Sequence, residues 1–392
     1  MTCLWAATFL VIFVRLALTS QHNIFQAYER AGVNWLAGAD LYTTTHGRGF
    51  VYSPLVAAFF AGLSLLPSVA ANIVWRLLNA AVFLGAVFSW LGSGINRIPK
   101  KHWALVFLFL QPLSLGNFNN GQANPVVIGL LMFGILGAGK ERWNLAAFCV
   151  AGAVYMKIYP LAAGLLLALV FPRKFAWRLA AALLVLGAAP FLFQKPSYVL
   201  AQYHDWIQTR LADDRRLYES NIAPHDLWMV LRALRVPISE SAYVALEFLS
   251  AGAIAAVCLL GRMRNWPPNR LLGALFTLAC CWMVLLGPAT ESPTYILLAP
   301  AAVFAAVQAF EEPRPVWLRA LAAAALFFFI EGFAINSFVL KKEPFAVVQP
   351  VGAIIFSCYA GLWFLTASFW ARRDEDFSMG LKSARTSARA GD

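Results

Sequence analysis

Charged residues are scarce in this chain, and that scarcity limits what kind of protein it can be. Only 13% of its 392 residues are Asp, Glu, Lys or Arg, whereas 60% are hydrophobic. Soluble domains are usually about a quarter charged and under half apolar. A soluble fold of this composition could not cover its own surface with polar groups, so the excess apolar surface has to face hydrocarbon. The composition therefore predicts an all-α, polytopic membrane protein.

The sequence also lacks the motifs of several enzyme classes. It holds no Walker phosphate loop, dinucleotide glycine motif, zincin motif or nucleophile elbow. The six cysteines lie in apolar runs without the spacing of a metal site or a disulfide framework. No internal repeat is visible, which argues against a transporter built from two related halves. The aromatic residues are distributed as core and interfacial belts, so nucleic-acid binding has no support.

The basic residues that are present fall into short clusters between apolar runs. They give a net charge of +12. The clusters are Arg97/Lys100/Lys101, Lys140/Arg142, Arg173/Lys174/Arg178, Arg262/Arg264/Arg270 and Arg372/Arg373. Such clusters mark the cytoplasmic loops of membrane proteins. We therefore expect the loops 92–102, 140–142, 172–177 and 262–269 and the tail after Trp370 to lie in the cytoplasm.

The apolar runs predict about 12 transmembrane helices. The candidate segments are 3–19, 54–66, 68–91, 103–117, 124–139, 143–156, 158–171, 178–195, 241–261, 270–286, 294–310, 316–335 and 348–371. We interpret the first as an uncleaved helix. This set is odd in number while both chain ends are assigned to the cytoplasm, so one segment has to fail to cross. Either 54–66 is re-entrant, or 143–156 and 158–171 form one broken helix.

Two longer stretches, 20–53 and 196–240, are expected on the outer side, each with an amphipathic helix. In the first stretch Tyr28, Ala31 and Trp35 share one helix face, and Gly38 is a suitable stop. Such a helix is predicted to lie flat at the membrane surface. We expect residues 1–371 to form a single membrane domain and 372–392 a disordered cytoplasmic tail.

Ionisable residues inside apolar runs are costly and are therefore candidates for function. Lys157 interrupts such a run just before Pro160, which favours a helix break. A cation there suits an anionic lipid phosphate, although a lysine that only extends to the interface is the alternative. Arg76, Glu247 and Glu331 fit buried structural pairs better than catalysis. Glu291, in a predicted outer turn, is better placed.

Amide side chains are concentrated between two apolar runs. Asn117, Asn119 and Asn120 precede Gln122 and Asn124, and Pro125 suits the first turn of the next helix. Amides offer paired donors and acceptors, which sugar hydroxyls require. Ordinary helix capping and turn formation is the alternative interpretation.

Taken in order, these motifs resemble glycosyltransferase family 87, over about residues 1 to 310. The run is Tyr28-Glu-Arg-Ala31-Gly32, Leu36-Ala-Gly38-Ala-Asp40-Leu-Tyr42, Phe50-Val-Tyr52-Ser-Pro54-Leu, Gly121-Gln122-Ala-Asn124, Ala151-Gly152 with Lys157-Ile-Tyr-Pro160, and Gly287-Pro288 with Tyr295. The resemblance implies a GT-C-like fold similar to that of polyprenol-phosphate-mannose-dependent α-mannosyltransferases. It implies sugar transfer, with mannose the expected hexose, from a polyprenyl-phosphate-linked donor to a glycolipid or glycan acceptor on the outer face of the cell membrane.

The sequence departs from the family pattern at three places. The family's catalytic aspartate falls near Ile24, where this chain reads His22-Asn23-Ile24 and has no carboxylate. The family's His-Tyr pair in the later outer turn reads Thr294-Tyr295 here. Asn221, within Ser220-Asn221-Ile222, is similar to part of the family's Asn-Gln-Ser motif.

Transfer to a hydroxyl requires a base for the acceptor and cationic or donor groups for the leaving phosphate. The candidate bases are Glu29, Asp40, His22 and Glu291. As alternatives to catalysis, Glu29 belongs to the solvent-exposed face of its helix, and Asp40 only stabilises a turn. The candidate substrate-binding residues are Lys157, Arg48, Tyr52, Gln122, Asn124, Asn221 and Tyr295. No metal ligands are assigned, and use of a divalent metal stays open. The alternative functions are a diverged protein that binds lipid-linked sugars and a transporter or flippase of lipid-linked saccharides.

Overall fold

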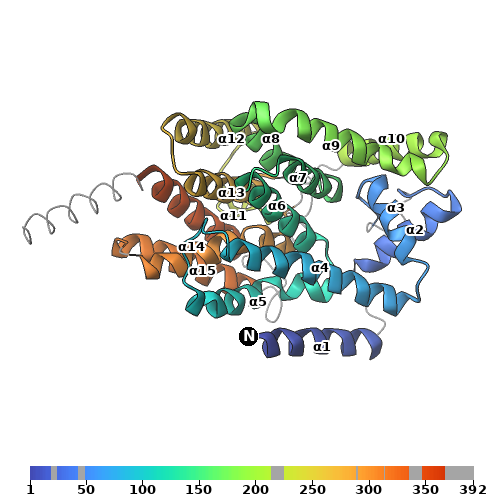
Figure 1. The fold of residues 1–392 in the computed structure, drawn as a ribbon, viewed down its shortest axis with the longest axis horizontal. Coiled ribbons are helices and arrows are strands. Elements are labelled where there is room, and N and C mark those ends of the chain that lie inside the picture. Colours follow the sequence, from blue (N-terminus) through green and yellow to red (C-terminus); the bar gives the residue numbers. More distant parts are fainter. Residues whose placement is uncertain are drawn as a thin grey trace, which may run out of the picture.

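The chain folds into helices. The computed structural model describes residues 1–18, 24–42, 49–212, 225–287, 290–312, 314–334 and 347–366, and none of these residues is in a strand. The α-helices are α1 (Thr2–Leu18), α2 (Phe25–Ala37), α3 (Pro54–Leu63), α4 (Ser68–Leu91), α5 (Trp103–Asn120), α6 (Asn124–Gly139), α7 (Trp143–Met156), α8 (Leu161–Val170), α9 (Trp177–Ala188), α10 (Pro196–Ala212), α11 (Leu227–Ala233), α12 (Glu240–Met263), α13 (Pro268–Leu285), α14 (Ala299–Glu311), α15 (Val316–Ala334) and a last helix, Val348–Thr366 (Figure 1). Short 3₁₀ or π turns occur at η1 (Lys100–His102), η2 (Pro172–Ala176), η3 (Ala189–Leu192) and η5 (Ser292–Leu297). The predicted all-α class is confirmed.

Five helices in the described part of the chain are long and apolar enough to cross a bilayer. They are α4, α12, α13, the continuous run Pro172–Leu192 around α9, and Val348–Thr366. Six more apolar helices are shorter, among them α3, which has 10 residues. A 10-residue helix is about 15 Å long, half the roughly 30 Å of hydrocarbon, so α3 is too short to cross as a straight helix. The protein is a membrane protein, and the expected total of about 12 crossings is not confirmed.

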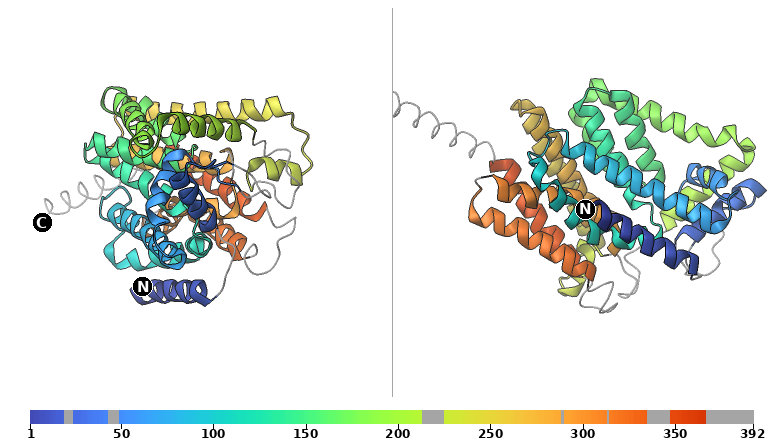
Figure 2. Two further views of the ribbon diagram at one scale, coloured as in Figure 1. Left: turned by 90° about the vertical axis from the view of Figure 1, so that its right-hand side faces the viewer. Right: turned by 60° about the horizontal axis from the view of Figure 1, so that its bottom comes forward.

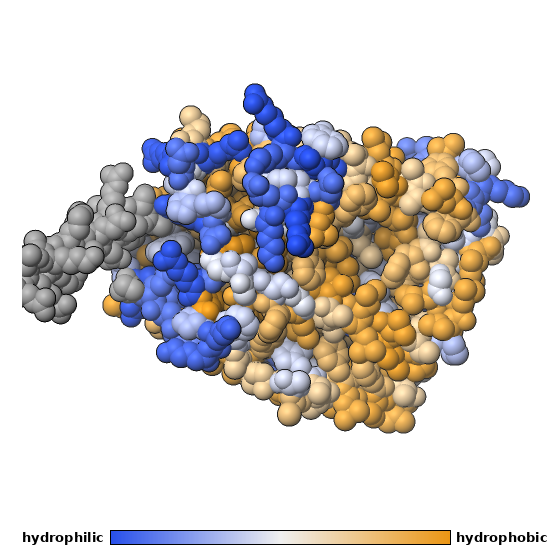
Figure 3. Space-filling model, in the orientation of Figure 1, coloured by the Kyte–Doolittle hydropathy of each residue, from blue (hydrophilic) through white to orange (hydrophobic). Residues whose placement is uncertain are grey.

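The outer surface of the bundle is apolar over wide areas. Phe248 and Leu249 of α12 are 75% and 72% exposed, and Leu184 of α9 is 74% exposed. Figure 3 shows hydrophobic side chains over most of the right-hand and lower surface, with hydrophilic ones gathered at the left and along the top. Large apolar side chains in such number are unfavourable in water and favourable against lipid tails. The surface therefore agrees with the membrane assignment from composition.

Helix α1 lies at the edge of the bundle, against α4 and α5 (Figure 2). Its Trp5 indole donates a hydrogen bond to the carbonyl of Phe107 at 3.2 Å, and Gln111 donates to Thr8 at 2.9 Å. The opposite face of α1 carries exposed apolar residues such as Leu10. One face of this helix thus contacts protein and the other is left for lipid.

The apolar face of helix α2, which the sequence led us to expect against the membrane surface, packs against protein. The predicted face of Tyr28, Ala31 and Trp35 is buried, and it contacts α3 and the start of α4. The helix ends at Gly38 as predicted, because Gly38 adopts the left-handed conformation with φ of 66°. The Phe60 ring stacks on the Tyr28 ring with the centroids 4.6 Å apart, and the Trp75 ring meets it edge to face at 5.8 Å. The amphipathic pattern was correct, but its apolar side is covered by the chain itself.

The two stretches predicted to lie on the outer side contact each other. Gln202 of α10 accepts a hydrogen bond from the Leu41 amide at 2.9 Å, and the Tyr198 hydroxyl donates to the Ala39 carbonyl at 2.7 Å. Helices α2, α3 and α10 accordingly lie together at the right of Figure 1. We call this the loop end of the bundle; α4 runs from it to the opposite end.

Close packing of α2 on α3 predicts a specific sensitivity at Gly32. A Cβ atom at Gly32 would lie 2.6 Å from the Phe60 carbonyl oxygen, whereas one at Gly62, on the exposed side of α3, would meet no atom within 4 Å. We expect Gly32→Ala to lower the free energy of unfolding by about 1–3 kcal/mol through overpacking. Gly62→Ala should leave it unchanged or raise it slightly. Thermal unfolding of both variants in detergent, followed by tryptophan fluorescence, tests this, and equal midpoints would contradict it.

Candidate active site at the loop end

Five elements of the chain meet at the loop end through backbone and side-chain hydrogen bonds. The Ile24 amide donates to the Asn120 carbonyl at 3.2 Å, which joins α2 to the end of α5. The Ser53 hydroxyl donates to the Tyr155 carbonyl at 2.8 Å, which joins α3 to α7. The Asn117 amide donates to the Pro293 carbonyl at 2.9 Å, which joins α5 to η5. Segments far apart in sequence are thereby held around one region.

The turn between α5 and α6 is built around a buried arginine. Arg76 of α4 is fully buried, and its guanidinium donates to the carbonyls of Phe118 and Asn119, both at 2.7 Å. These carbonyls lie in the last turn of α5, where a helix leaves its acceptors unsatisfied and favours a cation. Gly121 ends α5 with φ of 66°, and a Cβ there would lie 3.3 Å from Arg76. Arg76 is therefore a structural clamp, in line with the structural interpretation of its sequence.

The amide-rich segment mainly holds this turn together. Asn124 is 1% exposed, and its amide donates to the Asn117 oxygen at 3.0 Å and to the Pro293 carbonyl at 3.2 Å. Its own oxygen accepts from the Tyr159 hydroxyl at 3.4 Å. Pro125 occupies the first turn of α6, as predicted. Gln122 differs, because its half-buried side-chain amide makes no hydrogen bond among the described residues.

Lys157 lies in a break between two short apolar helices. Helix α7 ends at Met156, Lys157 is extended with φ of −153°, and α8 begins at Leu161 after Pro160. The ammonium lies 5.6 Å from the centre of the Tyr159 ring, and the side chain is half-buried. Burial lowers the pKa of Lys157 to about 8, with the nearby carboxylate of Glu291 opposing that shift. The predicted break is present, and it sets a cation at the edge of the apolar bundle.

Glu291 is the candidate base that shares this region with Lys157. It precedes η5, its side chain accepts from the Thr294 amide, and its own amide donates to the Thr294 hydroxyl at 3.1 Å. The residue is exposed, so its second carboxylate oxygen stays open to solvent or substrate. Its charge acts on Lys157 and on the hydroxyl of Tyr52. A carboxylate and an ammonium therefore belong to one electrostatic site.

Arg210 also belongs to this site, although the sequence analysis did not single it out. It lies near the end of α10, and its charge acts on both Lys157 and Tyr52. The available signal was its position as the basic residue in the last turn of an amphipathic helix in the second outer stretch. Because α10 contacts Ala39, Leu41 and Val51, its last turn comes close enough for Arg210 to act on Lys157.

The other candidate bases are engaged elsewhere or lie outside the described residues. Glu29 accepts a hydrogen bond from the Ser68 hydroxyl at 3.0 Å, at the start of α4. Asp40 accepts from the Tyr42 amide at 3.0 Å in a local turn, and it is exposed. Neither contributes to the electrostatics of Lys157, for which Glu291 and Arg210 are the charged neighbours. His22 lies outside the described residues.

The tyrosines predicted to bind substrate have different surroundings. The Tyr28 hydroxyl donates to the Tyr52 hydroxyl at 2.7 Å, and burial raises the pKa of Tyr52 to about 12. Tyr52 therefore keeps its proton, for which the described residues supply no acceptor. Tyr295 instead donates to the His225 carbonyl at 2.6 Å and so fixes η5 against the segment before α11. Arg48 and Asn221 lie outside the described residues, as does the tail 372–392.

Among the residues that the structure describes, no three His, Cys, Asp or Glu side chains gather as a metal site. The polar groups of the site are instead one ammonium, one guanidinium, one carboxylate, a phenol and a primary amide. Such a set can neutralise an anion and accept a proton from a hydroxyl within a single region.

The Arg76 clamp predicts that the loop end depends on one buried guanidinium. Arg76→Met keeps much of the side-chain volume but leaves the Phe118 and Asn119 carbonyls unsatisfied, at a cost of about 2–4 kcal/mol. We expect a lower unfolding midpoint in detergent together with faster proteolysis of the 117–124 turn. Arg30→Met, at an exposed position of α2, is the matched control and should behave like the unmodified protein. Equal stability of the two variants would contradict the clamp.

Comparison with known proteins assigns the chain to a family. The model of glycosyltransferase family 87 matches residues 50–288, more than half of the 392 residues. The match includes α3 to α13 and the Lys157 break, and it ends just before Glu291. No individually curated protein matches the chain. The protein is a membrane glycosyltransferase, and it belongs to glycosyltransferase family 87.

Proposed function

We propose that this glycosyltransferase transfers a hexose, with mannose as the first candidate, from a polyprenyl-phosphate-linked donor to a glycolipid or glycan acceptor. The observation that carries the proposal is the shared electrostatic site of Lys157, Arg210 and Glu291. Two cations suit the phosphate of a lipid-linked donor, and one carboxylate suits a proton acceptor. The site lies where two short apolar helices end, the depth at which a lipid places its phosphate.

In the proposed reaction the acceptor hydroxyl attacks the anomeric carbon of the donor sugar. The new carbon–oxygen bond forms as the bond from that carbon to the phosphate oxygen breaks, and the electron pair leaves with the phosphate. Glu291 accepts the proton of the attacking hydroxyl. Lys157 and Arg210 stabilise the charge that develops on the leaving phosphate. Glu291 thus takes the role that the family pattern gives to an aspartate near Ile24.

The proton of Tyr52 and the free amide of Gln122 complete the proposed site. Both are available for sugar hydroxyls, because among the described residues neither the Tyr52 proton nor the Gln122 amide is committed to another group. Asn124 and Tyr295 are positioning residues in this proposal, because they hold the α5–α6 turn and η5 in place. Residues of this kind position the groups that contact the substrate.

The distribution of basic clusters supports an outer location for the site. The loops with Arg97, Lys140, Arg173 and Arg264 follow α4, α6, α8 and α12. They lie near one another, because Lys174 pairs with Glu141, Arg262 donates to the Val170 carbonyl and Asn269 donates to the Gly94 carbonyl. Cytoplasmic loops are enriched in Lys and Arg. We therefore propose that the loop end, with Lys157 and Glu291, lies on the outer face, where a GT-C-like fold would bind donor and acceptor.

Substitution of the charged groups should distinguish the residues that take part in transfer from those that only stabilise the structure. We expect Glu291→Gln to lower kcat by about 10²–10⁴-fold, the usual contribution of a general base. Lys157→Met should lower kcat/KM by at least about tenfold through lost phosphate stabilisation. Asp40→Asn, which alters an exposed local turn, is the matched control and should retain transfer. The measurement is transfer of radiolabelled mannose from polyprenyl-phosphate mannose in proteoliposomes.

Two results would contradict the assignment. If Asp40→Asn were inactive while Glu291→Gln kept full kcat, Glu291 would not be the base. If the purified protein bound the donor but moved no sugar from any lipid-phosphate donor, a protein that only binds lipid-linked sugars would be the better description.

The pKa of Lys157 predicts a pH dependence of donor capture. Because burial lowers this pKa to about 8, the ammonium of the free enzyme is lost as the pH rises through about 8. We expect kcat/KM to fall above that pH, since it reports the free enzyme. A bound phosphate restores the ammonium and raises its pKa, so kcat should fall only at higher pH. Parallel pH profiles of kcat and kcat/KM, or a profile unchanged in Lys157→Arg, would contradict this role.

A further inference from the structure

A large cavity lies at the end of the bundle opposite to the proposed transfer site. Its volume is about 1050 Å³, and it is lined by residues after α4, before and within α13, along α14 and after it, and in the last helix. Ligand pockets usually measure about 300–1,000 Å³. The cavity therefore has room for an organic ligand, and the transfer chemistry leaves it without a role.

Arginines outnumber acids in this cavity. Its lining includes Arg97, Arg264, Arg270 and Arg314, but only Glu311 and Glu312 on the acidic side. Both carboxylates already have cationic or potentially cationic partners: Glu312 contacts Arg314 at 2.7 Å, and Glu311 contacts His102 at 2.8 Å. Among the described residues, the other three arginines have no acidic partner. The lining therefore carries positive charge that nothing described here neutralises.

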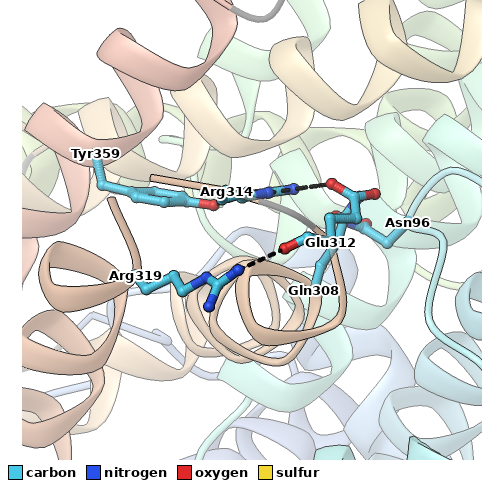
Figure 4. Close-up of polar contacts among 6 residues, drawn as sticks. All are labelled: Asn96, Gln308, Glu312, Arg314, Arg319 and Tyr359. Carbon is cyan, nitrogen blue, oxygen red and sulfur yellow. Dashed lines mark hydrogen bonds and ion pairs between the residues drawn. The ribbon is translucent and has the colours of Figure 1, made fainter. Parts of the chain in front are cut away.

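The two inner arginines of the cavity, Arg314 and Arg270, are held in fixed planes by aromatic rings. Arg314 is only 2% exposed, lies 3.6 Å from the centre of the Trp363 ring, and donates to the Tyr359 hydroxyl and to Glu312 (Figure 4). Arg270 lies 3.8 Å from the centre of the Trp266 ring and donates to the Phe364 carbonyl. Stacking on an aromatic face fixes the orientation of a guanidinium. The donors of Arg314 are already paired, whereas the Nε edge of Arg270 stays available to an acceptor.

Two further details indicate that an acceptor belongs in the cavity. The Nε of Arg270 is buried and has no hydrogen-bond partner among the described residues, whereas buried donors in proteins are nearly always paired. At the rim, Arg97 and Arg264 are exposed and donate to none of the described residues. Inner and outer arginines thus surround the same space from several elements.

We propose that this cavity binds a phosphate ester, either the headgroup of an anionic phospholipid or a soluble phosphate compound. Guanidinium groups match phosphate through paired hydrogen bonds. The cavity lies among the loops that carry the basic clusters, and basic pockets between helices on the cytoplasmic side suit anionic headgroups. The aromatic walls of Trp266 and Trp363 accommodate the apolar or ring portion of such a ligand.

The site is separate from the proposed transfer site. Neither Lys157 nor Glu291 is among the residues that line the cavity. Helix α5 begins at Trp103, next to His102, which pairs with Glu311 of the cavity lining, and ends in the 117–124 turn of the transfer site. Loss of binding in the cavity is therefore distinguishable from loss of transfer.

The test measures ligand binding to the full-length protein in detergent. Dihexanoyl phosphatidylglycerol, dihexanoyl phosphatidylcholine and a nucleoside diphosphate are titrated, and dissociation constants are taken from the shift of the thermal unfolding midpoint. The variant Arg97→Gln/Arg264→Gln removes two exposed rim cations. The variant Arg142→Gln/Arg173→Gln is its control, with the same charge change at the same end but outside the cavity.

We expect the rim variant to weaken binding of one phosphate ligand by about tenfold or more, the effect of losing charge-assisted hydrogen bonds. The control should bind as the unmodified protein does. Selective binding of phosphatidylglycerol over phosphatidylcholine identifies a lipid headgroup, and binding of the nucleoside diphosphate identifies a soluble ester. The proposal is overturned if no phosphate ligand binds, or if the rim variant and the control lose affinity equally.

Discussion

The loop end depends on how a lysine is accommodated where two apolar helices break. Lys157 lies between α7 and α8, outside both helices, and neither helix supplies a carboxylate to its ammonium. It is instead supported by the ring of Tyr159 and by the carboxylate of Glu291, which lies on η5 more than a hundred residues later in the chain. The cost of burying this cation is offset only if these distant segments meet. Assembly of the charged site therefore depends on the folding of the loop end.

Most polar side chains of the loop end are committed to the chain itself. Arg76 satisfies the carbonyls at the end of α5, and Asn124 and Tyr295 fix the turns on either side of the site. In an apolar environment an unpaired polar group costs more than it does at a water-exposed surface, so such commitments are expected. Other groups stay able to contact a substrate, among them Lys157, Tyr52, Gln122 and Glu291. The site can thus be identified from the polar side chains that are not required to stabilise the fold.

Local patterns in the sequence predicted local structure well. The break at Lys157, the helix start at Pro125 and the helix end at Gly38 follow from the conformational limits of proline and glycine, and each occurs. What the pattern could not give was the partner of each amphipathic face. The apolar side of α2 was compatible with lipid, yet α3 covers it because Gly32 permits close approach. Arg210 was missed for the same reason, since only the return of α10 onto the first stretch brings it to Lys157.

The two charged ends of the bundle use different chemistry and are electrostatically independent. The loop end combines a carboxylate, an ammonium, a guanidinium and a phenol, whereas the opposite end stacks arginines on indole rings. Over the roughly 27 Å length of α5, two unit charges interact by only about 0.6 kcal/mol at an effective dielectric constant near 20. That is too little for occupancy of one site to control the other through charge alone. Any coupling between them would have to travel through movement of α4, α5 or α14, the helices that connect the two ends.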